Sequence, residues 1–379
     1  MKTRLHPGGF TLIEVLVAAT IVVILMGIMV AMTDQTQRLV RSTSAKVEQF
    51  QEARVGFESM TRRLSQATLN TFWDYQYDKN GNPNGYTRKS ELRFHSGPMD
   101  ILNKAGGLGG NKQPGHGVFF QAPLGVVDDI KNLGAMDHLM NTWGYFLEIG
   151  SDADKFPAFL QKVVTPRKRY RLMELMEPSE KLSVYKFQND INNRQWFSQS
   201  ISGTGITGAR PVRVLAENIV ALIILPRLSL ADEKRISTTI PPVLSPAYNY
   251  DSTVTPPASQ NPSKPPTLIQ SLLNSKNQLP PVVQVIMVAI DEPSAKRLED
   301  LYNSDPYMGI GTNPDPVSGS ILFTDPAKLN DTSAGGKGDL TRLQDLLSST
   351  KNPNNRASYR VFSSNVNIRG AKWSLNTSN

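Results

Sequence analysis

The chain has 379 residues, which is enough for one large domain or two ordinary ones in addition to a membrane segment. Its formal charge of +8 is modest for this length and does not by itself indicate a nucleic-acid partner. Cysteine is absent, so disulfides are excluded, and the four histidines lack the spacing of a metal site. The sequence also lacks a Gly-x-Ser-x-Gly motif, so it gives little support for an enzyme, and we expect no cofactor.

The N-terminal region is dominated by one apolar segment. Between Val15 and Met32 the only polar side chain is Thr20. About 20 apolar residues in a helix cover about 30 Å, the thickness of the hydrocarbon core of a bilayer. Glu14 lies at the start of this segment, where a carboxylate without a partner is costly. We therefore predict a transmembrane helix over residues 10–32 whose one acid requires a cationic partner.

The run GGFTLIEVLVA at residues 8–18 resembles the class III leader of type IV pilins and type II secretion pseudopilins. The resemblance implies that prepilin peptidase removes residues 1–9 by cutting between Gly9 and Phe10, and that Phe10 is then N-methylated. It also implies that Glu14 meets the N-terminal ammonium of a neighbouring subunit during filament assembly, a pairing that makes a buried carboxylate tolerable. The alternative is a plain membrane anchor with a chance glutamate. An ordinary secretory signal is cut after its apolar region, whereas here the glycine precedes it, so the helix is retained.

The same resemblance implies a set of partners and a location. The partners are other pilin or pseudopilin subunits, the prepilin peptidase and methyltransferase, the lipid of the inner membrane and, indirectly, an assembly ATPase. The implied location is a single pass through the inner membrane, with a cytoplasmic N-terminus, an external head and a filament as the final site. Charge alone leaves the orientation undecided, because Lys2 and Arg4 precede the segment while Arg38, Arg41 and Lys46 follow it.

Beyond the membrane segment the helix is predicted to continue. No proline occurs between Pro7 and Pro83, so we expect one helix from about Phe10 to about Leu69. Its part over residues 33–70 is amphipathic and is expected to pack on a sheet, although an irregular coiled coil is an alternative. The apolar stripe consists of Val40, Val47, Phe50, Phe57, Met60, Leu64 and Ala67.

Residues 71–379 are predicted to form a β-rich head, so the fold class is α+β with a long N-terminal helix on an antiparallel sheet. A hairpin is expected from strands at 73–77 and 86–94 around a tip at 78–85. The tip residues Asp78, Asn80 and Asn82 have the spacing of a calcium loop and form a weak metal candidate. Pro83 and Lys89 occupy positions where such a loop needs Gly and Glu, so turn chemistry explains the pattern better. Further strands are predicted at 117–121, 143–149, 169–176, 182–187 and 212–215.

Two later segments, residues 214–224 and 280–290, resemble paired strands of the larger, J-type minor pseudopilins. Their apolar, β-branched composition predicts central antiparallel neighbours that are buried on both faces. The Pro-rich insertion between them, residues 231–279, is predicted to be disordered or extended, because its composition cannot bury a core. Helices at 292–301 and 339–348 and final strands within 357–373 complete the head.

Other motifs give weaker signals. The basic cluster at residues 167–171 is either a charged strand edge or a patch for anionic partners. The glycine-rich residues 101–117 are expected to form a mobile surface loop, and the GTGITG run at 203–208 a loop rather than a dinucleotide site.

The whole pattern resembles the filament proteins called Verru_Chthon cassette protein C. The leading hypothesis is a minor pilin-like structural subunit. The alternative is a module for filament-tip binding, adhesion or DNA uptake that uses loops 78–85, 101–117 and 231–279, and an anchored enzyme is a third possibility.

Overall fold

A computed structural model divides the chain into two units, Met1–Gln51 and Glu52–Asn379, and each is described by itself. The described residues are 11–99, 112–153, 157, 159, 163–188, 194–203, 210–236, 244–254, 275–302, 319–330, 336–348 and 356–373. The predicted loop at 101–117 therefore lies mostly outside the described residues, as does the predicted loop at 203–208.

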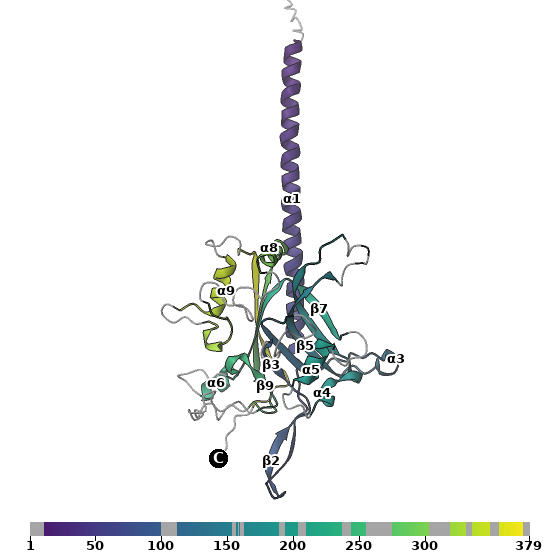
Figure 1. Ribbon diagram of the computed structural model, residues 1–379, viewed down its shortest axis with the longest axis vertical. Coiled ribbons are helices and arrows are strands. Elements are labelled where there is room, and N and C mark those ends of the chain that lie inside the picture. Colours follow the sequence, from purple (N-terminus) through teal and green to yellow (C-terminus); the bar gives the residue numbers. More distant parts are fainter. Residues whose placement is uncertain are drawn as a thin grey trace, which may run out of the picture. The chain divides into compact units, whose positions relative to one another are not determined.

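The first unit consists of most of helix α1, which runs over Leu12–Leu64 (Figure 1). Its stretch Leu12–Val40 is long and apolar enough to cross a membrane. The large apolar side chains between Leu12 and Met32 are each at least half exposed, so they surround the helix on every side. A helix that is apolar all round requires an apolar environment.

The last turns of α1, residues 52–64, belong to the second unit and carry a buried stripe. Ala53, Phe57, Met60 and Leu64 are buried at helical spacing, which confirms the prediction that the amphipathic part packs on a sheet. Two earlier members of the predicted stripe, Val40 and Val47, are 57% and 51% exposed. The helix ends at Leu64 rather than near the predicted Leu69, because Thr68 already pairs with Gln121 in an isolated β-bridge.

A six-stranded sheet forms the larger layer of the second unit. Its strand order is β7-β6-β5-β4-β3-β9, and all neighbours are antiparallel. The predicted strands at 117–121, 143–149, 169–176 and 212–215 are all present in it. The bounds are β3 His95–Pro98, β4 His116–Pro123, β5 Met140–Ser151, β6 Lys168–Glu177, β7 Val212–Glu217 and β9 Tyr250–Asp251.

The helices on one face of this sheet differ from the prediction. Residues 182–187, predicted as a strand, contain the helical turn α4 (Ser183–Lys186) after the 3-10 turn η3 (Ser179–Lys181). Helix α5 (Gln195–Ser202) was not predicted. Its Phe197 ring stacks on Phe119 of β4 with centroids 4.0 Å apart, and Trp196 is fully buried beside it.

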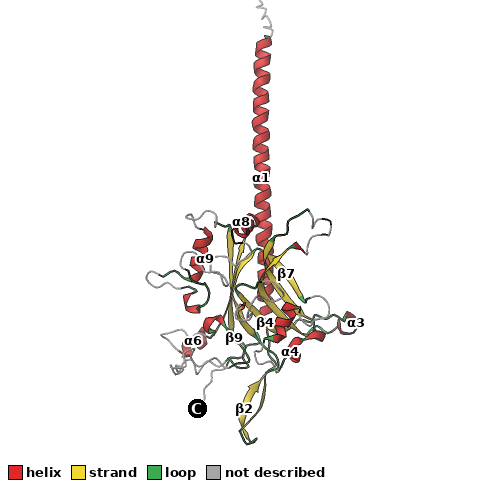
Figure 2. Cartoon of the chain, in the orientation of Figure 1, coloured by secondary structure: helices red, strands yellow, loops and turns green. Residues whose placement is uncertain are grey.

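A three-stranded antiparallel sheet, β11-β10-β8, forms the second layer. Its central strand β10 (Val282–Ile290) pairs with β8 (Ile219–Arg227) in a register that places Val285 opposite Ile224. This pairing confirms the predicted neighbours. β11 spans Tyr359–Asn367, and the two predicted helices α8 (Glu292–Tyr302) and α9 (Asp339–Ser348) are both present (Figure 2). They bury Leu298 and Leu343 in the same core.

Two residues connect the layers. Asn218, between β7 and β8, adopts a positive φ of 59°, donates its N–H to Tyr170 O (2.7 Å) and accepts from Ile290 N (3.0 Å). His116 of β4 accepts the N–H of Ile224 in β8 through Nδ1 (3.1 Å), and its Nε2 lies 3.2 Å from the carbonyl of Phe323. Asn218 is thereby bonded to one strand of each sheet. His116, itself on the large sheet, is bonded to a strand of the smaller sheet and to the loop that contains Phe323.

The Pro-rich segment contributes to the core, which corrects the prediction that it would not. Leu244, Tyr248, Tyr250 and Leu279 are each at most 4% exposed. β9 adds a sixth strand by pairing with β3, and Ser252 Oγ accepts the N–H of Phe94. The described helical parts of this segment are α6 (Leu230–Ile236) and the 3-10 turn η4 (Pro246–Tyr248).

The predicted hairpin is present as a separate two-stranded sheet, β1 (Phe72–Tyr77) and β2 (Pro83–Lys89). β2 ends at Lys89 rather than at the predicted residue 94. The remaining short elements are α3 (Ile130–Leu133) and the 3-10 turn η5 (Pro326–Lys328).

Candidate functional site

The first turn of α1 is closed by a reciprocal pair of hydrogen bonds between Thr11 and Glu14. Glu14 Oε2 accepts from the backbone N–H and from the hydroxyl of Thr11, both at 2.9 Å. The N–H of Glu14 in turn lies 3.4 Å from Thr11 Oγ1. This is a capping box, in which an N-cap threonine and a glutamate three residues later satisfy each other's backbone donors. The Glu14 carboxylate is thereby held at the N-terminal end of the apolar helix.

Of the three predicted N-terminal site residues, the structure describes one. Gly9 and Phe10 lie outside the described residues, so the predicted cut and methylation remain predictions. Within the described part of the chain, Glu14 Oε2 takes both bonds to Thr11 and Oε1 takes none. The other polar side chain of the apolar segment, Thr20, donates its hydroxyl to Leu16 O at 2.7 Å and so needs no water.

The weak metal candidate at the hairpin tip is a turn. Asp78 Oδ1 accepts the N–H groups of Asn80 and Asn82, each at 2.8 Å, and Asp78 N donates to Asn82 O at 2.9 Å. An aspartate that accepts backbone N–H groups two and four residues later shapes a tight turn, as expected from turn chemistry. Among the described residues, no group of three or more His, Asp or Glu side chains could hold a metal ion.

Most of the basic cluster at residues 167–171 lies on β6, an internal strand of the large sheet. β6 lies between β5 and β7, so the prediction of a charged strand edge is wrong. Arg169 is hydrogen-bonded to Glu292 of α8 and lies 3.7 Å from Asp152. Burial by itself would raise the pKa of Glu292, but the hydrogen bonds from Arg169 and Asn218 outweigh it and hold that pKa below its ordinary value.

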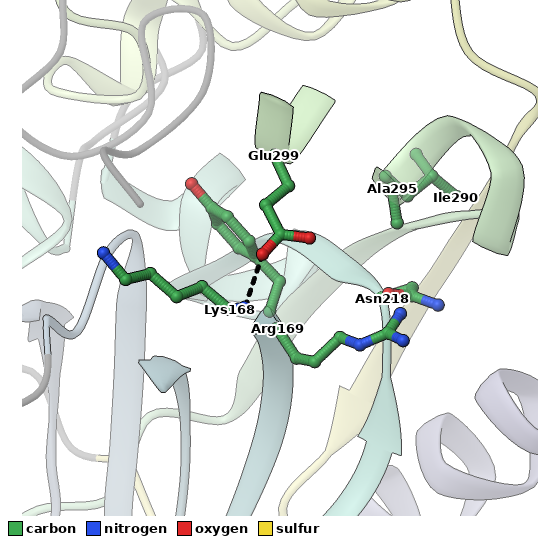
Figure 3. Close-up of a pocket in the computed structure, with 7 residues that line it drawn as sticks. Lys168, Arg169, Asn218, Ile290, Ala295 and Glu299 are labelled. Atoms are coloured by element: carbon green, nitrogen blue, oxygen red, sulfur yellow. Dashed lines mark hydrogen bonds between the residues drawn. The ribbon is translucent and has the colours of Figure 1, made fainter. Parts of the chain in front are cut away.

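Figure 3 shows the junction at which this cluster meets α8. Glu299 accepts the backbone N–H of Lys168 at 2.6 Å, and Arg169 and Asn218 line the same small pocket. The pocket leaves no room for a water-sized molecule. The ion pair of Arg169 with Glu292 and the hydrogen bond from the Lys168 backbone to Glu299 fasten α8 to β6.

A second charged cluster joins the end of α1 to the large sheet. Glu174 of β6 is fully buried, accepts from Tyr145 OH at 2.9 Å, and pairs with Arg63 of α1 and Arg213 of β7. The Arg63 guanidinium also lies 4.3 Å from the ring centroid of Trp143. Burial, followed by the charge of Glu174, raises the pKa of Tyr145 far above its ordinary value. A buried carboxylate with two guanidinium partners is a compensated charge, and removing one partner is costly.

No spacing along the chain relates these partners, so they could not be recognised from the sequence. Arg63 and Glu174, for example, are 111 positions apart.

Comparison with known proteins bears on the start of α1. Residues 6–30 match the prokaryotic N-terminal methylation motif. The motif is typical of the type IV pilin and pseudopilin family, and it spans the capping box and the first part of the apolar helix. No curated protein and no solved structure matches the chain. The comparisons therefore support a pilin-like N-terminus and identify no subfamily.

Proposed function

We propose that this chain is a pilin-like structural subunit, a minor component of a type IV pilus or of a type II secretion-like filament. Prepilin peptidase removes residues 1–9, Phe10 is N-methylated, and residues 10–32 keep the subunit in the inner membrane until it is assembled. The observation that carries the proposal is the capping box of Thr11 and Glu14, at the start of a helix that is apolar on every side and within a matched methylation motif.

The position of Glu14 supports a role in pairing with a neighbour. A cut after Gly9 makes Phe10 the first residue, so the new ammonium is one residue away from the N–H that Glu14 already accepts. A charged side chain costs about 2.5–3.5 kcal/mol on insertion scales at the bilayer centre, and the cost for Glu14, near the end of the segment, lies below that value. Oε1 accepts no hydrogen bond from the described residues, and a neighbouring subunit's ammonium at this oxygen offsets that cost. Assembly therefore neutralises the buried acid.

The rest of the chain fits the same role. The helix continues from residue 33 to Leu64 and leads to a head of residues 71–379, which we place on the far side of the membrane from a cytoplasmic N-terminus. The head is large, and bulky heads tile poorly along a filament shaft, so we place the subunit at a tip or another minor position. The chemistry of processing and the work of assembly are supplied by the partner peptidase, methyltransferase and ATPase, and the chain itself is a structural protein rather than an enzyme.

Replacement of Glu14 tests the proposal. We expect Glu14→Ala to leave membrane insertion and leader cleavage intact but to reduce incorporation into filaments about a hundredfold. The physical reason is that an unpaired ammonium at an apolar interface costs about 3 kcal/mol or more. The measurement is the ratio of subunit in sheared filaments to subunit in the membrane fraction, by quantitative immunoblotting in the native host.

The matched control is Asp34→Ala, which removes another exposed acid of α1, one whose partner is Arg38 in the same helix. We expect that variant to assemble like the wild type. If Glu14→Ala assembles as well as Asp34→Ala does, Glu14 has no pairing role and the segment is a plain anchor.

A further inference from the structure

The β1–β2 hairpin carries an aromatic face that the filament role does not use. Trp73, Tyr75 and Tyr77 alternate along β1 and therefore share one face. The register places Arg88 opposite Trp73 and Tyr86 opposite Tyr75, so both side chains join that face. We call these five residues the aromatic face of the hairpin.

The rings of this face contact one another and remain open to solvent. Tyr75 lies 5.0 Å from Tyr86 and 6.4 Å from Tyr77 between centroids, and the Arg88 guanidinium lies 5.4 Å from the Trp73 ring. Trp73, Tyr77 and Tyr86 are 65%, 59% and 65% exposed, and Tyr75 is 47% exposed. Figure 1 shows the hairpin, labelled β2, projecting from the sheets of the second unit. A contiguous exposed patch of large rings marks an interaction site.

Apart from Phe72, the opposite face of the same hairpin is polar, and its charges are balanced. Asp74 and Lys89 form an ion pair across the strands at 2.5 Å, next to Gln76 and Thr87. The sequence of residues 72–89 contains three cations and two acids, and no Leu, Ile, Val or Met. The near-neutral charge disfavours a polyanion, whose binding depends on several cations. The lack of aliphatic side chains disfavours deep insertion into the hydrocarbon core of a bilayer.

The size of the aromatic face disfavours a folded protein as the sole partner. Fully burying an aromatic side chain removes about 150–250 Å² from solvent, so four half-exposed rings have about 400 Å² left to bury. A stable protein interface needs about 800 Å² from each partner. A linear polymer that crosses several rings in succession fits this smaller area better.

We propose that the aromatic face of the hairpin binds a neutral polysaccharide. The C–H faces of sugar rings are apolar and pack on the rings of Trp73 and the tyrosines. The hydroxyls at the sugar edges bond to the tyrosine hydroxyls and to the side-chain amides of Asn80, Asn82 and Asn84 at the tip. A proline-rich peptide, which also packs on aromatic rings, would leave these donors and acceptors unused. The binding does not depend on filament entry, so it stands or falls separately from the proposed function.

The test uses the full chain in detergent, by affinity electrophoresis in gels that contain hydroxyethylcellulose, xylan or glucomannan. We expect at least one polysaccharide to retard the wild type, and Trp73→Ala to weaken that retardation about tenfold. The double variant Tyr75→Ala/Tyr86→Ala, which removes the central cross-strand pair, is expected to abolish it. Phe72→Ala, on the opposite face of β1, is the matched control and is expected to bind within twofold of the wild type. Circular dichroism and thermal unfolding verify that each variant is folded.

Three results would overturn the proposal. The first is the absence of retardation of the wild type in all three gels. The second is equal retardation of the wild type and the folded double variant. The third is binding of single-stranded DNA, of anionic phospholipid vesicles or of a polyproline peptide that depends on Trp73 while the polysaccharides do not bind.

Discussion

Both nitrogens of the His116 imidazole ring are hydrogen-bonded, Nδ1 to β8 of the smaller sheet and Nε2 to Phe323 in a loop. Nδ1 accepts the N–H of Ile224, so the neutral ring carries its proton on Nε2 and donates it to Phe323 O. Protonation of Nδ1 would remove the acceptor for Ile224. Burial lowers the pKa of His116 to about 4, and the hydrogen bond to the carbonyl of Phe323 only partly opposes that shift. The ring is therefore neutral in the folded head at neutral pH.

The stability of the head should consequently fall in acid. The unfolded chain takes up this proton near pH 6.5 and the folded head only near pH 4, so the unfolded state binds more protons between these values. The contribution is fully present above pH 6.5 and is lost as the pH falls to about 4, a change of about 3 kcal/mol. Urea unfolding at pH 7 and at pH 4.5 measures it. We expect His116→Gln to be less stable at pH 7 and to lose less stability on acidification.

His138→Gln, which changes an exposed histidine, is the control and should retain the acid sensitivity of the wild type. Equal acid sensitivity in His116→Gln and the wild type would show that His116 does not carry this effect.

Residue-scale information in the sequence was uneven. The Thr-x-x-Glu spacing of Thr11 and Glu14 is a recognisable helix-start signature, so the capping box could have been predicted from the printed residues. The partners of Glu174 could not, because Tyr145, Arg213 and Arg63 reach it only through strand register and helix packing.

At the scale of elements, the close approach of β4 and β5 depends on Gly144. A Cβ at this position would lie 2.3 Å from a ring carbon of Phe119, its partner across the strands. That ring is already stacked on Phe197, so it cannot move without disturbing α5. We expect Gly144→Ala to destabilise the head by about 1–3 kcal/mol, as overpacked cores do. Thermal unfolding measures the effect.

Gly56→Ala, in the part of α1 that belongs to the same unit, is the variant to compare with Gly144→Ala. A Cβ there meets Ala216 at 3.4 Å and Leu215 at 3.5 Å, which is ordinary contact, and Gly56 lies inside α1. We expect this variant to be as stable as the wild type or more stable by up to about 1 kcal/mol, because alanine favours the helix. A larger loss for Gly56→Ala than for Gly144→Ala would contradict the packing described for both.

Some elements were predictable from their periodicity or composition, and others were missed. β8 and β10 have long apolar, β-branched runs, so their pairing followed from composition. α5 is short, yet its buried Trp196, Phe197, Ser200 and Ile201 have helical spacing that could have been recognised. The alternation within 182–187 favoured a strand, whereas the chain turns there after Pro178.

At the scale of the whole molecule, the fold class was predictable and the extent of the core was not. The α+β class followed from a long apolar helix and a later series of short strands. The average composition of residues 231–279 concealed Leu244, Tyr248 and Tyr250, three apolar anchors that reach the core between polar stretches. A segment's mean composition therefore underestimates its contribution when a few large side chains carry the packing.

Only the part of the candidate site that belongs to this chain could be predicted from its sequence. The apolar helix and Glu14 are both printed in the sequence, and the structure adds the capping box that holds the carboxylate in place. The partner that would neutralise Glu14 belongs to another subunit, so neither the sequence nor the structure of one chain includes it. The central claim therefore concerns what happens to this N-terminus in the cell.

Mass spectrometry of the mature N-terminus, on protein purified from its native host, tests that claim most directly. We expect a chain that begins at Phe10 and carries one methyl group on its amino nitrogen. The same host without prepilin peptidase should yield the chain with residues 1–9 still attached. An intact nine-residue leader on the protein from cells with active peptidase would contradict the account.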